Sequence, residues 1–226
     1  QLPLIFKNTA DRFEKIKLGM PISNYLYKNL EDKGIHTLGY GVPLMEYIWT
    51  VKKPIKKPSD MKGMRLRVSG KIDSKTVAAL GASPVRLPSS ETYMALKRGI
   101  VDGLLSYPGT VAGRKMEDML HYCTKAPFGC YGVILMTTQK RWESWPENVR
   151  KILSEGGKRY ETDFYETCKK VNDAYFETKL KDTEVIMLTE NEKKEFQKNM
   201  GGIYEWWIDL VGKEGGEEAL QIIREQ

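Results

Sequence analysis

The sequence predicts an α/β fold with a largely parallel sheet, and two observations support that prediction. Between residues 64 and 105, short apolar runs alternate with amphipathic helical segments at the close spacing typical of strand–helix–strand units. Farther along, apolar residues recur at three- and four-residue steps from about residue 147 to 180, which at 1.5 Å per residue makes a helix roughly 50 Å long. One compact domain has little use for such a helix, whereas a helix that braces two lobes does.

The N-terminal quarter of the chain predicts two helices followed by two strands. The first helix starts at Asn8 or Thr9, has Phe13 and Ile16 on its buried face, and is interrupted before Pro21. The second helix stops at a glycine whose left-handed conformation suits the position after a helix end. The expected helices cover residues 8–18 and 22–30, with Gly34 as the stop, and the strands cover residues 36–40 and 47–51.

Strands and helices then alternate up to residue 105. In the first strand, Met64, Leu66 and Val68 face one side, while Arg65 and Arg67 face the other. The elements that follow are a helix at 72–80, a strand at 85–87, a helix capped by Ser89 that ends at Gly99, and a strand at 100–105.

The C-terminal half predicts mainly helices. The segment Ser144–Glu147 has the spacing of a capping box and opens the long helix, in which Gly156 and Gly157 mark a place for a bend. A second capping box lies at Thr189–Glu192. The other expected elements are helices at 110–120, 190–210 and 219–223 and strands at 131–137 and 182–187.

Charge and cysteine content exclude several classes of protein. Lys and Arg exceed Asp and Glu by 36 to 30, and this net charge of +6 is spread without a dense basic block, so a nucleic acid is not an expected partner. Cys123 and Cys130 are close enough in sequence for a disulfide in an oxidising compartment, but buried free thiols are the preferred interpretation. With two histidines and no Cys-x-x-Cys pair, we expect no metal site and no cofactor.

The sequence carries no recognisable catalytic motif. It contains no G-x-S-x-G, no Walker A loop and no G-x-G-x-x-G. A Ser-His-Asp triad would require His36 or His121, and neither lies in the context of a nucleophile. We therefore expect a protein that is not an enzyme, and an α/β enzyme with an unrecognised site is the less favoured alternative.

Arg67 is the most informative charged residue. It lies on the polar face of an apolar strand, just before a Ser-Gly turn into a helix, and ligands of α/β sheets bind at the carboxyl ends of strands. A guanidinium there presents a planar fork that pairs with both oxygens of a carboxylate. The alternative is an ordinary surface or interdomain ion pair. Arg65 shares the face and serves as a control, because we expect it nearer to solvent.

Four sequence blocks follow one another at short spacing. They read SDMKGMRLRV (59–68), LGASPV (80–85), SETYMAL (90–96) and GIVDG (99–103). In this order they resemble the DctP-type extracytoplasmic solute-binding proteins of tripartite ATP-independent periplasmic (TRAP) transporters. The resemblance covers the whole chain and includes Trp145-Pro146 before a helix that crosses both lobes in the family.

The resemblance implies a two-lobe fold of the periplasmic binding protein type (type II), with the long helix spanning both lobes. Lobe I is expected at 1–44 and 132–172, and lobe II, which carries the carboxylate-binding arginine, at 45–131 and 173–226. The first residues of the chain resemble a segment that lies in the middle of lobe I in the family. We therefore expect lobe I to lack its N-terminal block. An incomplete lobe would expose a sheet edge and favour a homodimer.

The resemblance also assigns candidate site residues. Arg67 matches the family's carboxylate-binding arginine, and Ser106 stands where many members have an asparagine that helps to hold the carboxylate. Ser89 stands where some members have an aromatic residue, and Tyr47 lies near a second, more variable arginine. Losing that second cation argues against a multiply charged acid. The residues that could wall a less polar pocket, or equally pack in the core or hinge, are Tyr47, Trp49, Tyr107 and Tyr131.

The function implied by the resemblance is extracytoplasmic, periplasmic binding of a small organic acid and its delivery to the integral-membrane TRAP permease. The lobes would close over the ligand by a hinge motion. A sensor or interaction domain that reuses the two-lobe fold is the alternative from another class. The sequence does not identify the ligand.

Overall fold

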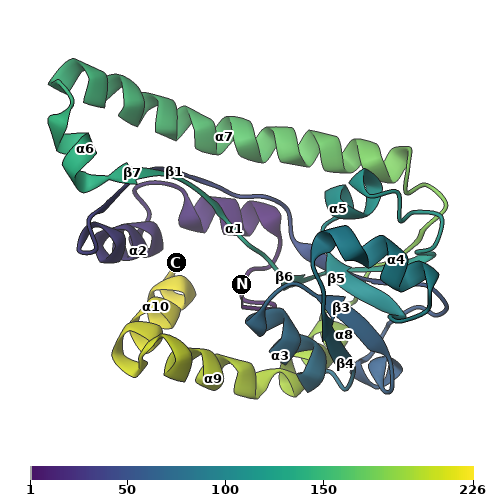
Figure 1. Ribbon diagram of the computed structural model, residues 1–226. Coiled ribbons are helices and arrows are strands. Elements are labelled where there is room, and N and C mark those ends of the chain that lie inside the picture. The colour runs from purple at the N-terminus through teal and green to yellow at the C-terminus, as the bar shows by residue number, and fades with distance from the viewer. Residues whose placement is uncertain (1) are drawn as a thin grey trace.

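The computed structural model describes residues 2–226, which form two β-sheets flanked by helices (Figure 1). The strands are β1 (Ile35–Gly41), β2 (Glu46–Thr50), β3 (Arg65–Val68), β4 (Ser83–Arg86), β5 (Gly103–Ser106), β6 (Tyr122–Gly129), β7 (Val133–Thr138) and β8 (Glu184–Ile186). The helices are α1 (Thr9–Ile16), α2 (Pro21–Glu31), α3 (Lys71–Ala79), α4 (Thr92–Lys97), α5 (Pro108–Gly113), α6 (Gln139–Ser144), α7 (Glu147–Glu177), α8 (Glu190–Asn199), α9 (Gly201–Val211) and α10 (Lys213–Glu225).

The larger sheet has six strands in the order β4-β3-β5-β2-β6-β8. It is mixed, because β2 runs antiparallel to both of its neighbours, whereas β3 is parallel to β4 and β5, and β6 is parallel to β8. The expectation of a largely parallel sheet is therefore wrong at its centre. Strand β6 was not expected from the sequence, since Lys125 and Pro127 break its apolar alternation and a proline within a run argues against a strand.

Both faces of this sheet are buried, and successive residues of one strand belong to different apolar cores. Ile48 and Leu105 pack in one apolar cluster with β3 and α9, and Trp49 and Leu104 pack in the other with α1 and α4. Successive side chains of a strand point to opposite faces, so β2 contributes Ile48 to the first cluster and Tyr47 and Trp49 to the second. The central strand is thereby fixed in register from both sides.

The second sheet consists of β1 and β7, which are antiparallel. Helix α7 lies against β1, and a methyl group on Gly157 would collide with the carbonyl oxygen of Leu38. From the same helix, buried Glu161 accepts hydrogen bonds from the backbone N–H groups of Leu18 (2.8 Å) and Tyr40 (2.7 Å). Gly157 of the predicted glycine pair thus allows a close approach between helix and strand. The bend expected at this pair does not break α7, which is one continuous helix.

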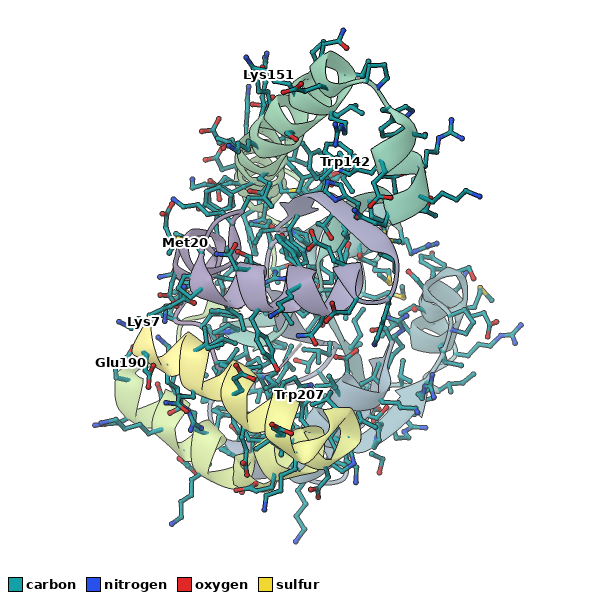
Figure 2. All side chains as sticks on the ribbon, turned by 90° about the vertical axis from the view of Figure 1, so that its left-hand side faces the viewer. Lys7, Met20, Trp142, Lys151, Glu190 and Trp207 are labelled. Carbon is teal, nitrogen blue, oxygen red and sulfur yellow. The ribbon has the colours of Figure 1, made fainter. Side chains whose placement is uncertain are left out.

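Helix α7 connects the two sheets, as its length predicted. Its 31 residues span about 46 Å at 1.5 Å per residue. Its first half covers β1, and its last turn reaches the larger sheet, where Phe176 stacks on Trp49 with 6.0 Å between ring centroids. Figure 1 shows α7 running from α6 to α5, and Figure 2 shows α2 between the α6–α7 pair and the C-terminal helices.

Three predicted helix features differ in the structure. The helix expected at 110–120 ends at Gly113, and the turn that follows contains Lys115 in the left-handed conformation (φ 54°). Ser144 does not cap α7, because it ends α6 and its hydroxyl donates to the carbonyl of Arg141. Ser89 opens a short 3-10 turn without a capping hydrogen bond. The capping box at Thr189 and Glu192 is confirmed.

The three cysteines are free thiols, as preferred from the sequence. Cys123 and Cys130 are buried free thiols, and Cys168 is free and half-buried. Within residues 2–226, no helix combines the length and apolar composition needed to cross a membrane.

Candidate functional site

A cavity of about 280 Å³ opens at the carboxyl ends of β3 and β5. Ligands of α/β sheets bind in such places, where strands end and loops leave the sheet. The first residue of β2 lies there too, because β2 runs antiparallel to β5 and begins where β5 ends. The lining residues are Glu46, Arg67, Ser69, Ser89, Ser106, Tyr107, Thr110 and Tyr131.

Arg67 is the single cationic side chain among the described lining residues. It is 5% exposed, and its Nε donates a hydrogen bond of 3.0 Å to the carbonyl oxygen of Leu87. Burial lowers the pKa of Arg67, while the nearby Glu46 and Asp73 act to raise it. A guanidinium remains charged in proteins. No acidic residue within 2–226 forms an ion pair with Arg67, so its two terminal amino groups are available to a ligand anion.

Arg65 has the solvent-facing position expected of it. Its side chain is 47% exposed and forms an ion pair of 3.0 Å with Asp102. Its terminal amino group also donates to the carbonyl oxygen of Gly99 (2.8 Å). The two arginines of β3 therefore differ sharply, because one is held on the surface by an acidic partner and the other lines a cavity without one.

The predicted serines lie on the same cavity wall as Arg67. Ser106 is 2% exposed at the end of β5, and Ser89 follows the loop whose Leu87 carbonyl holds Arg67. Ser69 was not singled out from the sequence, and its hydroxyl donates to Asp73 (2.6 Å) at the start of α3. Three serine side chains thus line the same cavity as the guanidinium, a setting suited to the oxygens of a small acid.

The four predicted aromatic residues divide into two pairs. Tyr107 and Tyr131 line the cavity and meet edge to face, with ring centroids 4.6 Å apart. Both also line a neighbouring, mainly apolar cavity of about 250 Å³. Tyr47 and Trp49 point into the apolar core instead, where the indole N–H of Trp49 donates to the backbone carbonyl of Ser106 (2.9 Å). The structure thus places Tyr47 and Trp49 behind the cavity wall, as packing residues.

Glu46 is a lining residue that the sequence did not reveal. It is 4% exposed, and its Oε2 atom has no hydrogen-bond partner in the described part of the chain. Burial raises the pKa of Glu46 well above its ordinary value, and Asp73 and Cys130 add to the rise. A single glutamate before an apolar run is typical of a solvated strand start, so no sequence signal marked it.

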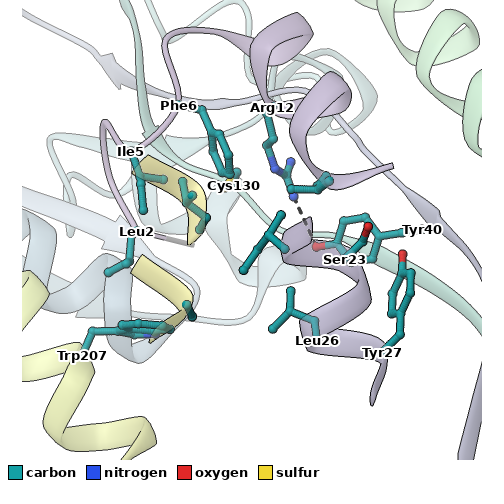
Figure 3. Close-up of a pocket in the computed structure, with 14 residues that line it drawn as sticks. Leu2, Ile5, Phe6, Arg12, Ser23, Leu26, Tyr27, Tyr40, Cys130 and Trp207 are labelled. Carbon is teal, nitrogen blue, oxygen red and sulfur yellow. Dashed lines mark hydrogen bonds between the residues drawn. The ribbon is translucent and has the colours of Figure 1, made fainter. Parts of the chain in front are cut away.

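A separate apolar cavity of about 150 Å³ lies between the N-terminal segment, α1, α2 and the C-terminal helices (Figure 3). Its one cationic group among the described residues is Arg12, which is 2% exposed. The Arg12 guanidinium donates to the carbonyl oxygens of Tyr131 (2.6 Å) and Pro43 (3.3 Å) and to the hydroxyl of Tyr40 (3.4 Å). Because the protein's own oxygens already take its N–H groups, this cavity is less suited to an acid than that of Arg67.

Comparison with known proteins places this chain in a family. A family model described as bacterial extracellular solute-binding protein, family 7 (DctP) matches residues 1–209. The chain belongs to this family. It is similar to the C4-dicarboxylate-binding protein DctB of Bacillus subtilis (26% identity, covering 93% of this chain and 61% of that protein). It is also similar to the C4-dicarboxylate-binding periplasmic protein DctP of Rhodobacter capsulatus (28% identity, covering 94% of this chain and 64% of that protein).

Solved structures confirm the predicted fold class of this family 7 chain. A TRAP periplasmic solute-binding protein from Sulfitobacter sp., with bound β-D-galacturonate, matches it with a TM-score of 0.87 at 22% identity, over 100% of this chain and 73% of that one. A TRAP periplasmic solute-binding protein from Shewanella oneidensis, with bound succinate, matches with a TM-score of 0.79 at 23% identity, over 98% of this chain and 73% of that one. The chain spans less than two thirds of the length of the two curated relatives.

The site residues include no grouping suited to a metal ion. Within residues 2–226, no cluster of three or more His, Cys, Asp or Glu side chains has the arrangement of a metal site. The chemistry present in the cavity is one buried guanidinium, one buried carboxyl group and several hydroxyl groups. A buried guanidinium with hydroxyl groups nearby has the charge and the hydrogen-bond donors suited to an organic anion.

Proposed function

We propose that the protein binds a small organic acid outside the cytoplasm and presents it to an integral-membrane TRAP permease. Membership of the solute-binding family supports this, as do the names of relatives that bind C4-dicarboxylates. We propose binding rather than catalysis, since the cavity holds the groups that retain an anion. The periplasmic names of relatives support the extracytoplasmic location.

The observation that carries this proposal is that Arg67 is buried at the cavity without an acidic partner in residues 2–226. A buried cation without an ionic partner is unfavourable in the empty protein. A ligand carboxylate would provide the missing charge through two parallel N–H···O bonds, in a site where little water competes. Ser106 and Ser89 would then hold the same carboxylate or the atoms beside it, because both line the cavity around the guanidinium.

The two-lobe division gives this site a way to close. We propose lobe I at 1–44 and 132–172 and lobe II at 45–131 and 173–226. The Arg67 cavity lies within lobe II, and the neighbouring cavity is lined from lobe I by Pro43, Leu44 and the segment 167–172 of α7. A rotation of the lobes about the connecting segments would narrow that second cavity over a ligand held by Arg67.

The test is calorimetric titration of the purified chain with lactate, propionate and succinate, using wild type, Arg67→Ala and Arg65→Ala. We expect Arg67→Ala to weaken binding by about a hundredfold, the order expected when a charge-assisted hydrogen-bonded pair is lost. Arg65→Ala should stay within about threefold, because an exposed ion pair contributes little. Equal losses in the two variants, or no binding of any acid by wild type, would refute the proposal.

A further inference from the structure

The cavity contains a second buried ionisable group that Arg67 does not neutralise. Glu46 lines the cavity, is 4% exposed, and makes no ion pair with Arg67 or with any other residue between 2 and 226. Its Oε2 atom is buried without a hydrogen-bond partner. This Oε2 atom lies against Gly129 of β6, while Glu46 reaches the cavity as one of its lining residues. Buried polar groups are nearly always hydrogen-bonded, so a ligand hydroxyl in the cavity would supply this carboxyl group with a partner that the protein does not.

The strand register places Glu46 at the edge of the sheet where β5 ends and the Arg67 cavity opens. Glu46 is the residue before Tyr47, which pairs with Ser106 at the end of β5, and Ser106 lines the same cavity as Arg67. On its other side Glu46 pairs with Gly129 of β6. Glu46 lies on the strand next but one to β3 and lines the same cavity as Arg67, so a ligand that extends from Arg67 across the cavity meets Glu46.

We propose that Glu46 is a specificity-determining residue that hydrogen-bonds a hydroxyl group on the carbon next to the ligand carboxylate, so that the cavity takes 2-hydroxy monocarboxylic acids. This inference rests on the proposed function, because it requires the carboxylate to sit on Arg67. A hydroxyl both donates and accepts, so it matches a carboxyl group in either protonation state. A second carboxylate at this position would find no cation to neutralise it, because Arg67 is the single cationic side chain among the described lining residues.

The groups around Glu46 decide its charge. Its pKa is raised first by burial and then by Asp73 and Cys130, whereas Arg67 acts to lower it. Glu46 in turn helps to raise the pKa of Tyr107 and Tyr131, which face it across the cavity. Within residues 2–226, the charged and titratable neighbours are thus Arg67 of β3, Asp73 of α3, Tyr107 after β5, and Cys130 and Tyr131 after β6. A protonated Glu46 leaves Arg67 as the one charge at the ligand carboxylate.

The test measures how well the cavity distinguishes lactate from propionate, which differ only in the 2-hydroxyl group. Wild type should bind lactate about tenfold more tightly, the effect of one hydrogen bond in a closed site. Glu46→Leu should reduce that ratio to about one while still binding propionate. Glu46→Gln should keep most of the ratio, because an amide is also a donor and an acceptor. A raised melting temperature for Glu46→Leu would exclude misfolding as the cause of a lost ratio.

Several results would overturn the inference and leave the proposed function intact. One is a wild type that binds propionate as well as lactate, and another is a Glu46→Leu variant that keeps the lactate preference. Tighter binding of alanine than of lactate would assign Glu46 to an ammonium group instead. If wild type binds none of these acids and no succinate, the proposed function fails together with the inference.

Discussion

Among single residues, Glu46 makes the stability of the fold depend on pH. Burial raises the pKa of its carboxyl group well above the ordinary value of 4.5. The folded protein therefore keeps this proton at a pH where the unfolded chain has lost it. Since the folded state then binds more protons than the unfolded state, the contribution of Glu46 to the free energy of unfolding falls as the pH rises above about 4.5.

Replacing Glu46 by glutamine should remove this dependence. Wild type and Glu46→Gln should be about equally stable below pH 4.5, the ordinary value for a glutamate. The variant should become progressively more stable than wild type as the pH rises through the raised pKa, after which the difference stays constant. Urea denaturation followed by circular dichroism over a pH series measures it. A difference between the two proteins that does not change with pH would contradict the prediction.

The sequence distinguished some site residues and not others, for physical reasons. Alternation in β3 placed Arg65 and Arg67 on one face, and the position of Arg67 at the carboxyl end of the strand favoured it as the site residue, with Arg65 nearer to solvent. The partners that hold the two side chains, Asp102 and Leu87, could not be predicted, because other elements supply them. Glu46 escaped notice because its burial results from pairing with β6, a strand that the sequence did not predict.

At the scale of elements, two adjacent glycines of α7 offer a matched experiment. A methyl group on Gly157 would collide with the carbonyl oxygen of Leu38, whereas one on Gly156 would meet no atom within 4 Å. Gly156→Ala should stabilise the protein by about 0.5–1 kcal/mol, because alanine has the higher helix propensity. Gly157→Ala should destabilise it by about 1–3 kcal/mol, since the helix must move away from β1.

Thermal or urea denaturation of the two variants measures both effects, with each serving as the control for the other. If both glycines behave alike, the close approach of α7 to β1 is wrong. The length of α7 could be predicted because its periodicity is local, but this contact could not, since it depends on a strand more than a hundred residues away. The mixed order of the larger sheet escaped prediction for the same reason, because strand pairing is set by distant segments.

At the scale of the whole molecule, the smaller sheet is unusual in its exposure. Val133, Ile134, Leu135 and Met136 of β7 are each more than a third exposed. Adjacent residues of a strand point to opposite faces, so both faces of β7 are uncovered in the described chain. Within residues 2–226, β7 pairs with β1 alone, which leaves its other edge free for a further strand.

An uncovered strand with a free edge and apolar side chains on both faces favours association with another chain. We therefore expect the 226-residue chain to self-associate as its concentration rises, with β7 in the interface. Met136→Lys should shift the equilibrium toward monomer, because a charge would be buried in the contact. The control is Ile152→Lys on α7, which puts the same charge at an apolar residue that is 66% exposed and belongs to another element. Sedimentation velocity over a range of concentrations distinguishes the outcomes, and a wild type that stays monomeric, or an equal effect of the two variants, would contradict an interface at β7.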